Sequence, residues 1–131
     1  SDRFGTLAMK DIQFEGTSKT PAVAFTSDPL EISLSGRSIP ENSIEFYRPL
    51  IAWVDENCQE EASELQVNIK LEYFNTSSSK CLMDLFKRIE KAAPQASVHW
   101  YYEDEDEDML EAGEDYDAII DIPFRLIATA S

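Results

Sequence analysis

The chain has few of the residues from which catalytic and metal sites are built. Its 131 residues include one histidine, two cysteines and four glycines. Cys58 and Cys81 lack metal-site spacing, and four glycines form no phosphate-binding loop. His99, alone on a strand pattern, supports no nucleophilic triad; a small hydrolase would need a cleft that gathers His99 with carboxylates. We therefore expect no enzyme, no metal and no other cofactor.

Basic residues are also scarce, and this shortage limits the partners. The chain has 11 Lys and Arg against 26 Asp and Glu, a net charge of −15. A field of this sign repels nucleic acid and anionic membrane surfaces, so we expect neither as a partner. No apolar run approaches the ~20 residues of a membrane span, and no signal region opens the chain. These patterns favour a cytoplasmic protein in which Cys58 and Cys81 are buried thiols.

The apolar pattern predicts a single two-layer α/β domain. Apolar residues alternate with polar ones along each main strand, so helices should cover one face of the sheet only. We predict a mixed sheet of about five strands with about three helices packed on one face. The predicted strands are Pro21–Phe25, Leu30–Gly36, Leu65–Phe74, Ala96–Tyr102 and Phe124–Ala128, and helical stripes lie between the second and third, third and fourth, and fourth and fifth.

Two boundaries accompany this prediction. Residues 1–20 are weakly periodic and are interpreted as a tail or edge segment, with Met9 as the native start and residues 1–8 left over from expression. Residues 21–131 form the domain. Pro40 suits the first turn of the first helix, and Pro49 lies inside its apolar stripe. We expect a kink at Pro49 or a helix that begins near Phe46.

A cluster of hydroxyls stands where the Leu65–Phe74 strand passes into a helix over roughly Ser77–Ala92. In one interpretation Asn75 or Thr76 caps the helix, which is worth about 0.5–2 kcal/mol relative to alanine. In the other the cluster holds a covalently attached phosphate, because a helix start offers unpaired amides and positive potential. A single capping side chain is enough for the helix, so the cluster holds more hydroxyl groups than capping requires.

An acidic stretch from Glu103 to Asp117 carries ten carboxylates and no base. Met109, Leu110, Ala112 and Tyr116 within it form a weak helical stripe. The default interpretation is a solvated surface, and a docking surface for a basic partner is the alternative. A cation-responsive, calcium-type module is a third hypothesis, since Asp104, Asp106 and Asp108 match the first, third and fifth positions of a calcium loop. Met109 replaces the glycine of that loop, and Asp115 replaces its final glutamate.

The chain resembles the SiaC family of bacterial regulatory phosphoproteins from Thr20 to about Ala128. The resemblance rests on five segments: Phe74-Asn75-Thr76-Ser77-Ser78, Pro40-Glu41-Asn42-Ser43, Tyr47, Trp53-Val54 and Trp100-Tyr101-Tyr102. It implies a STAS-like fold, in which a phosphorylatable residue follows a strand at the start of a helix. By this analogy Thr76 is the phosphoacceptor, with Ser77 and Ser78 as secondary candidates and Asn75, Ser79 and Lys80 as its environment.

The resemblance also implies a function. Family members are substrates of a dedicated protein kinase and a PP2C-type phosphatase. Their unphosphorylated form binds and activates a GGDEF-type diguanylate cyclase, which links them to cyclic-di-GMP and biofilm formation. We therefore expect a non-enzymatic phospho-switch. The candidates for contact with the partner are Glu41, Asn42, Glu103, Asp104 and Asp106.

Overall fold

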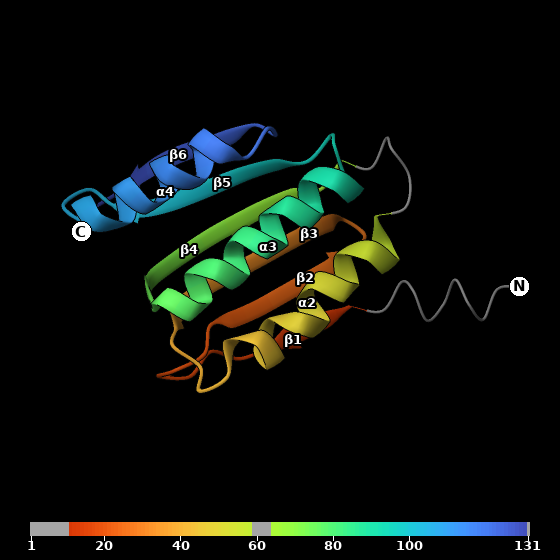
Figure 1. Ribbon diagram of the computed structural model, residues 1–131, viewed down its shortest axis with the longest axis horizontal. Coiled ribbons are helices and arrows are strands. Elements are labelled where there is room, and N and C mark those ends of the chain that lie inside the picture. The colour runs from red at the N-terminus through yellow and green to blue at the C-terminus, as the bar shows by residue number, and fades with distance from the viewer. Residues whose placement is uncertain (1–10, 59–63, 131) are drawn as a thin grey trace, which may run out of the picture.

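The structure, a computed structural model, describes residues 11–58 and 64–130. The elements occur in the order β1 (Ile12–Phe14), β2 (Ala22–Ser27), β3 (Leu30–Ser38), α2 (Ser43–Asn57), β4 (Gln66–Phe74), α3 (Thr76–Ala92), β5 (Ser97–Glu103), α4 (Glu107–Ile119) and β6 (Phe124–Thr129). The six strands form one mixed sheet in sequence order (Figure 1). β1, β2 and β3 pair antiparallel, and β3 to β6 pair parallel.

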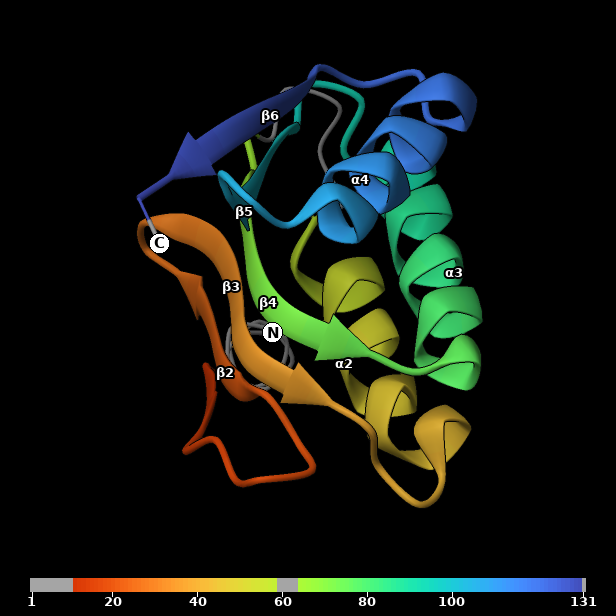
Figure 2. The same cartoon turned by 90° about the vertical axis from the view of Figure 1, so that its left-hand side faces the viewer.

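The helices α2, α3 and α4 of the described residues lie on the same face of the sheet, as the alternating strands predict (Figure 2). Val67, Ile69 and Leu71 point toward the helices and are buried, while Lys70 and Glu72 point away from them. The core is continuous from β2 to β6, and its largest fully buried side chains include Trp100, Tyr47, Phe25, Phe86, Ile32 and Leu34. The predicted α/β class, with helices on a single face, is confirmed.

The strand count differs from the prediction of about five. β1 pairs with β2 through Ile12↔Phe25 and adds a sixth strand inside the segment 1–20. Three residues are too few to show an alternating pattern, so the sequence gives no periodic signal for this strand. The proposed native start at Met9 and residues 1–8 lie outside the described residues.

Helix α2 also begins earlier than one prediction allowed. The Asn42 side chain accepts a hydrogen bond from the Glu45 amide at 3.1 Å, and the helix runs from Ser43 through Pro49 without interruption. A start near Phe46 is therefore wrong, and Pro40 precedes the helix instead of lying in its first turn. The missing donor of Pro49 is tolerated because the buried stripe of Tyr47, Leu50 and Val54 secures both sides of it.

A β-bulge lies near the carboxyl ends of β3 and β4. Gly36 pairs with Leu71 and Arg37 pairs with Tyr73, so β4 holds one extra residue at Glu72. Gly36 adopts φ +98°, a conformation that favours glycine. The bulge changes which side chains face the core: Phe74 packs edge-on against Trp100 at 6.0 Å, while Tyr73 is half exposed below the Arg37 guanidinium.

Candidate functional site

The helices α2, α3 and α4 all begin at one edge of the sheet. β3, β4 and β5 are parallel, and each is followed by a helix, so the N-caps Asn42, Asn75 and Asp106 all lie beyond the carboxyl ends of these strands (Figure 1). This is the edge at which open α/β sheets usually bind ligands. Each helix start also contributes positive potential. The structure thus brings the residues predicted around Glu41, Thr76 and Glu103 to one edge of the domain.

The start of α3 is held by its cap. The Asn75 side chain accepts a hydrogen bond from the Ser78 amide at 2.9 Å, and the Asn75 amide donates to the Ser38 carbonyl at 3.1 Å. The first of these satisfies an amide that has no partner inside the helix. The second joins the loop to the end of β3. Asn75 therefore fixes where the predicted phosphoacceptor region lies, and Thr76 is the first helical residue.

A buried chain of hydroxyls lies below this turn. Ser38 Oγ donates to Ser78 Oγ at 2.9 Å, and Ser78 Oγ donates to the Ser38 carbonyl at 2.9 Å. Ser38 has only one hydroxyl proton, so the 2.6 Å contact with Tyr47 is donated by the tyrosine. Ser38, Ser78 and Tyr47 are each 0% exposed. The hydroxyl protons of Ser38, Ser78 and Tyr47 are all donated within this buried set. Because Ser78 is fully buried, no kinase can reach it in this fold.

The neighbouring serines, Ser77 and Ser79, also make contacts. Ser77 Oγ lies 2.7 Å from Ser43 Oγ and donates to Asn75 Oδ1 at 3.2 Å. The Tyr116 hydroxyl donates to the Ser79 carbonyl at 2.8 Å and lies 3.3 Å from Ser79 Oγ. The start of α3 is thereby joined to α2 through Ser43 and to α4 through Tyr116.

Thr76 differs from the three serines that follow it. Its side chain is exposed, and within residues 11–58 and 64–130 no group hydrogen-bonds to its hydroxyl. As the first helical residue it has an amide that no intrahelical carbonyl can accept. Lys80 follows one turn later and is exposed on the same face of α3. A phosphate on Thr76 would thus meet free amides and an ammonium group without disturbing the buried hydroxyls.

Burial controls the ionisation of the two tyrosines in these contacts. It raises the pKa of Tyr47 to about 12, and the hydrogen bond with Ser38 lowers that pKa only in part. Burial likewise raises the pKa of Tyr116 to about 12, against a smaller lowering by Ser79. Both hydroxyls are therefore neutral donors at physiological pH, and their hydrogen bonds persist across the whole range in which a cell operates.

The acidic candidates lie at the same edge of the sheet, and one of them, Asp106, caps a helix. The Asp106 carboxylate accepts the Met109 amide at 3.0 Å and caps α4, and Met109 is buried. Glu103 and Asp104 are exposed where β5 ends. The described part of the chain contains no group of three side chains suited to a metal ion. The arrangement gives the calcium-type hypothesis no support, because Asp106 already serves its own helix.

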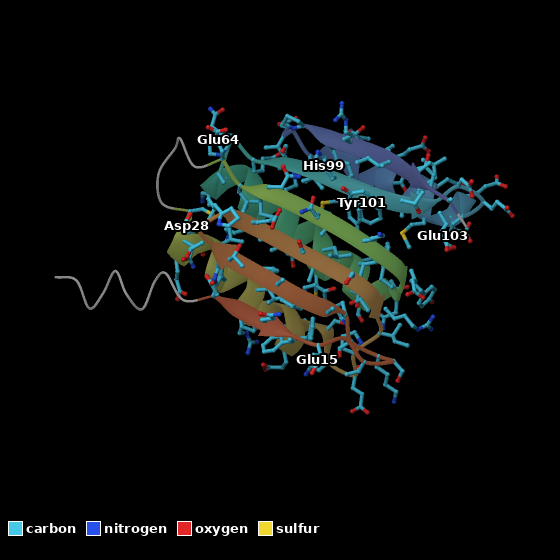
Figure 3. All side chains as sticks on the ribbon, turned by 180° about the vertical axis from the view of Figure 1, so that it is seen from behind. Glu15, Asp28, Glu64, His99, Tyr101 and Glu103 are labelled. Carbon is cyan, nitrogen blue, oxygen red and sulfur yellow. The ribbon has the colours of Figure 1, made fainter. Side chains whose placement is uncertain are left out.

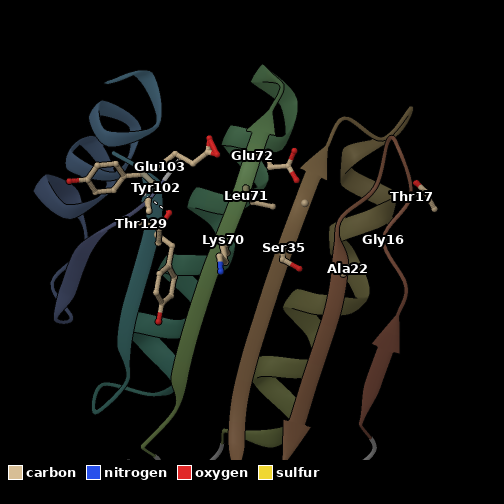
Figure 4. A pocket seen from close by; sticks show the side chains of 13 residues that line it. Gly16, Thr17, Ala22, Ser35, Lys70, Leu71, Glu72, Tyr102, Glu103 and Thr129 are labelled. Carbon is tan, nitrogen blue, oxygen red and sulfur yellow. Dashed lines mark hydrogen bonds between the residues drawn. The ribbon is translucent and has the colours of Figure 1, made fainter. Parts of the chain in front are cut away.

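The opposite face of the sheet is open and polar (Figure 3). Gln66 donates to His99 Nδ1 at 2.7 Å and to Asn68 at 3.0 Å, so the imidazole is held by an amide and not by a carboxylate. On the same face, a groove of about 700 Å³ runs over the carboxyl ends of β3, β4, β5 and β6, from Thr17 to Thr129 (Figure 4). Lys70 lies in it with its ammonium group 5.8 Å from the Tyr101 ring. Among the described residues no carboxylate hydrogen-bonds to His99, so the arrangement does not support the hydrolase hypothesis.

Sequence reasoning missed the buried hydroxyl chain. Ser38 and Ser43 look like ordinary residues near a helix start, and Tyr47 looks like one member of an apolar stripe. The contact between Ser38 and Ser78 joins positions 40 residues apart, and no local pattern reports such a pair. The only available signal was that the segment 75–79 holds more hydroxyls than a cap requires.

These features define a small α/β domain with an accessible threonine at a helix start. The chain matches the model of the SiaC family regulatory phosphoproteins over residues 14–129 and belongs to that family. An uncharacterized protein of Pseudomonas aeruginosa strain UCBPP-PA14 is 32% identical over 123 residues, which cover 92% of this chain and 98% of the relative.

Solved structures agree with this assignment. Apo-SiaC of Pseudomonas aeruginosa is 31% identical, covers 92% of this chain and all of its own, and superimposes with a TM-score of 0.84. SiaC in a crystal structure with the diguanylate cyclase SiaD, which it activates, is also 31% identical. That match covers 91% of this chain and 100% of the relative, with a TM-score of 0.85. None of the helices in residues 11–58 and 64–130 has the length and apolarity needed to cross a bilayer.

Proposed function

We propose that the chain is a cytoplasmic phospho-switch that binds a diguanylate cyclase, activates it when unphosphorylated and is itself without catalytic activity. A kinase adds phosphate to Thr76 and a PP2C-type phosphatase removes it. Through the cyclase the switch acts on cyclic-di-GMP and biofilm formation. Membership of a family of regulatory phosphoproteins and the complex of a relative with its cyclase support this role.

One observation carries the choice of Thr76. Of the four hydroxyls in the segment 76–79, only that of Thr76 has no hydrogen-bond partner among the described residues, and it is exposed. Phosphorylating Ser77 would break its contact with Ser43, and Ser78 is inaccessible. Thr76 gains a phosphate at a helix start, where about 0.3–1 kcal/mol of favourable electrostatics is typical. The phosphate introduces about −1.5 to −2 charges on the surface that the partner would cover.

The acceptor is tested by mass spectrometry of the protein purified from its own host under conditions with and without the kinase. We expect one phosphate on the peptide that contains Thr76. Thr76→Ala should abolish it and keep the fold, since the side chain makes no contact that the fold needs. Ser79→Ala serves as the matched control and should remain phosphorylated. Full phosphorylation of the Thr76→Ala protein would overturn the assignment.

The output is tested by titrating each diguanylate cyclase of the same organism with the chain and measuring cyclic-di-GMP synthesis. The unphosphorylated protein should bind one cyclase and raise its rate. Protein phosphorylated at Thr76 should bind that cyclase at least about tenfold more weakly, because the partner must desolvate a dianion. If the unphosphorylated chain binds none of the cyclases, the proposed partner class is wrong.

A further inference from the structure

β6 is an open edge of the sheet. It stands last in the strand order and pairs with β5 in a regular parallel register over its whole length. Among the described residues no strand pairs with its outer side, and α4 lies over one of its faces instead of beside it (Figure 2). The edge has six residues, twice as many as β1, and Arg125 is its single charged side chain. β6 therefore has few of the features that usually prevent a further strand from pairing with an edge.

The outer side of β6 presents unpaired backbone groups. The Pro123 carbonyl accepts the Val98 amide at 2.8 Å, so this residue directs its backbone toward β5. Backbone groups alternate in direction along a strand, and the odd-numbered residues of β6 therefore face β5. The amides and carbonyls of Phe124, Leu126 and Ala128 consequently point outward, and no described group hydrogen-bonds to them. These donors and acceptors form the row with which an added strand pairs.

One side of α4 borders this edge with acids. A Cβ on Gly113 would lie 2.7 Å from Leu126 Cδ2, so the Gly113 side of α4 lies over β6. Leu110, Glu114 and Asp117 follow one another at spacings of four and three residues and lie on this side of the helix. Leu110 is half-buried, and both acids are exposed. A chain added to β6 would therefore run beside two carboxylates and one aliphatic side chain.

Charge identifies the kind of chain that fits this edge. α4 carries six acids and no base, in a chain with a net charge of −15. A second copy paired through β6 about a twofold axis would bring two such helices onto the same face of the joined sheet, where they repel each other. A basic segment is attracted instead, and complementary charge raises association rates and selects partners. The occupant that charge favours is therefore a basic segment of another protein.

We propose that β6 receives an extended, basic segment of a partner protein as a further strand of the sheet. Backbone groups of that segment pair with Phe124, Leu126 and Ala128, and such main-chain hydrogen bonds supply affinity without regard to sequence. The side chains of the segment alternate between the two faces of the sheet. Those on the helical side are lysines or arginines that pair with Glu114 and Asp117, and they provide the specificity.

This edge lies apart from the proposed phosphoacceptor. β6 is two strands away from β4, at whose end Thr76 begins α3, and α4 stands between the edge and α3 (Figure 1). A segment paired with β6 leaves Thr76 uncovered, so its binding should be the same in both phosphorylation states. The inference goes beyond the proposed function and does not rest on it. It adds a second surface, which suits a partner that stays bound while the switch changes state.

The edge is tested with a synthetic peptide of about eight residues in which lysine alternates with valine and both ends are blocked. The peptide is titrated into the isotopically labelled full chain, and the backbone amides are followed by nuclear magnetic resonance. The amides of Phe124, Leu126 and Ala128 should shift and exchange more slowly with solvent, whereas those of Arg125 and Ile127 should change little. This alternation identifies an added strand, because attraction by charge alone would act on α4 and leave no such pattern in β6.

Variants test the charges and the backbone separately. Glu114→Lys combined with Asp117→Lys should weaken peptide binding at least about tenfold, because the bordering carboxylates become ammonium groups. Glu111→Lys combined with Asp115→Lys is the matched control: both residues are exposed on the other side of α4, so the same change of charge should weaken binding much less. Ala128→Pro removes an outward donor and no bond to β5, so it should weaken binding and keep the fold.

Several results would overturn the inference. Shifts without alternation in β6 would show a contact by charge alone, and equal peptide affinity in the two lysine variants would remove the role of Glu114 and Asp117. If the chain without peptide forms dimers in which the outward amides of β6 are protected, a second copy occupies the edge instead.

The independence from the switch is tested with Thr76→Glu, which imitates part of the charge of a phosphate. This variant should bind the peptide like the wild type, and loss of binding would contradict the separation of the two surfaces. A chain that activates no cyclase removes the proposed function and leaves the peptide result unchanged. The two proposals can therefore fail separately.

Discussion

Among the described residues the Thr76 hydroxyl has no hydrogen-bond partner, whereas the hydroxyls of the serines that follow it are bonded. Ser38, Ser78 and Tyr47 are joined by buried hydrogen bonds, Ser78 also lies 3.3 Å from Ser43 Oγ, and Ser77 and Ser79 contact Ser43 and Tyr116. A buried hydroxyl that lost its partner would cost about 1–3 kcal/mol, so these contacts are maintained. Ser78 is inaccessible, and Ser77 is exposed but already hydrogen-bonded to Ser43. These two observations support the proposed choice of Thr76 as the acceptor.

At the scale of the residue, the two buried tyrosines predict how stability depends on pH. The pKa of each is about 12 in the folded protein and about 10 when unfolded. Their contribution is fully present below pH 10. Between pH 10 and 12 the unfolded chain loses these protons first, so the unfolding free energy should fall by about 1.4 kcal/mol per pH unit for each tyrosine.

Urea unfolding between pH 9 and 12 measures this fall. Burial also raises the pKa of Cys58, to about 11, which contributes with the same sign. Tyr116→Phe is therefore the informative comparison, because it removes one tyrosine and leaves the thiols. Its unfolding free energy should depend less steeply on pH than that of the wild type. An equal slope in both proteins would show that Tyr116 titrates normally in the fold.

At the scale of the element, α4 packs unusually close to the sheet. A Cβ on Gly113 would lie 2.6 Å from Trp100 Cδ1 and 2.7 Å from Leu126 Cδ2. The indole cannot easily move, because Trp100 is fully buried and its Nε1 donates to the Met109 carbonyl at 3.0 Å. Glycine is thus required for this approach, although it weakens the helix itself by about 0.8–1 kcal/mol relative to alanine.

Gly113→Ala should therefore lower the unfolding free energy by about 1–3 kcal/mol, since the overpacking outweighs the gain in helix propensity. Denaturant unfolding followed by circular dichroism gives the value. Glu114→Ala, at the exposed neighbouring position, provides the matched control and should change stability by less than about 0.5 kcal/mol. A Gly113→Ala protein that is more stable than the wild type would mean that α4 shifts outward at little cost.

The elements also show what a sequence can predict. Alternation in β4 and the stripe of Leu82, Leu85, Phe86 and Ile89 in α3 are strong periodic signals, and both the one-sided sheet and the helix at Thr76 follow from them. The bulge at Glu72 and the close approach at Gly113 depend on which strand or ring lies opposite. Such information is absent from local periodicity.

At the scale of the whole molecule, charge is distributed unevenly. α4 carries six acids and no base, whereas α3 has a surplus of bases. The described residues contain two ion pairs, Glu45–Arg48 and Asp55–Arg88, and both are exposed. Exposed pairs contribute little, about 0–1 kcal/mol each. Repulsion among the surplus carboxylates is therefore the main electrostatic effect on the folded state.

Salt should consequently stabilise this protein. Raising NaCl from about 10 to 150 mM shortens the screening length from about 30 to 8 Å, which weakens repulsion between carboxylates on different elements. We expect the melting temperature to rise by a few degrees, corresponding to about 1 kcal/mol. Replacing Glu111 and Glu114, both exposed on α4, with lysine lowers the net negative charge and should shrink this rise. A melting temperature that falls with salt would instead show that attraction between opposite charges dominates.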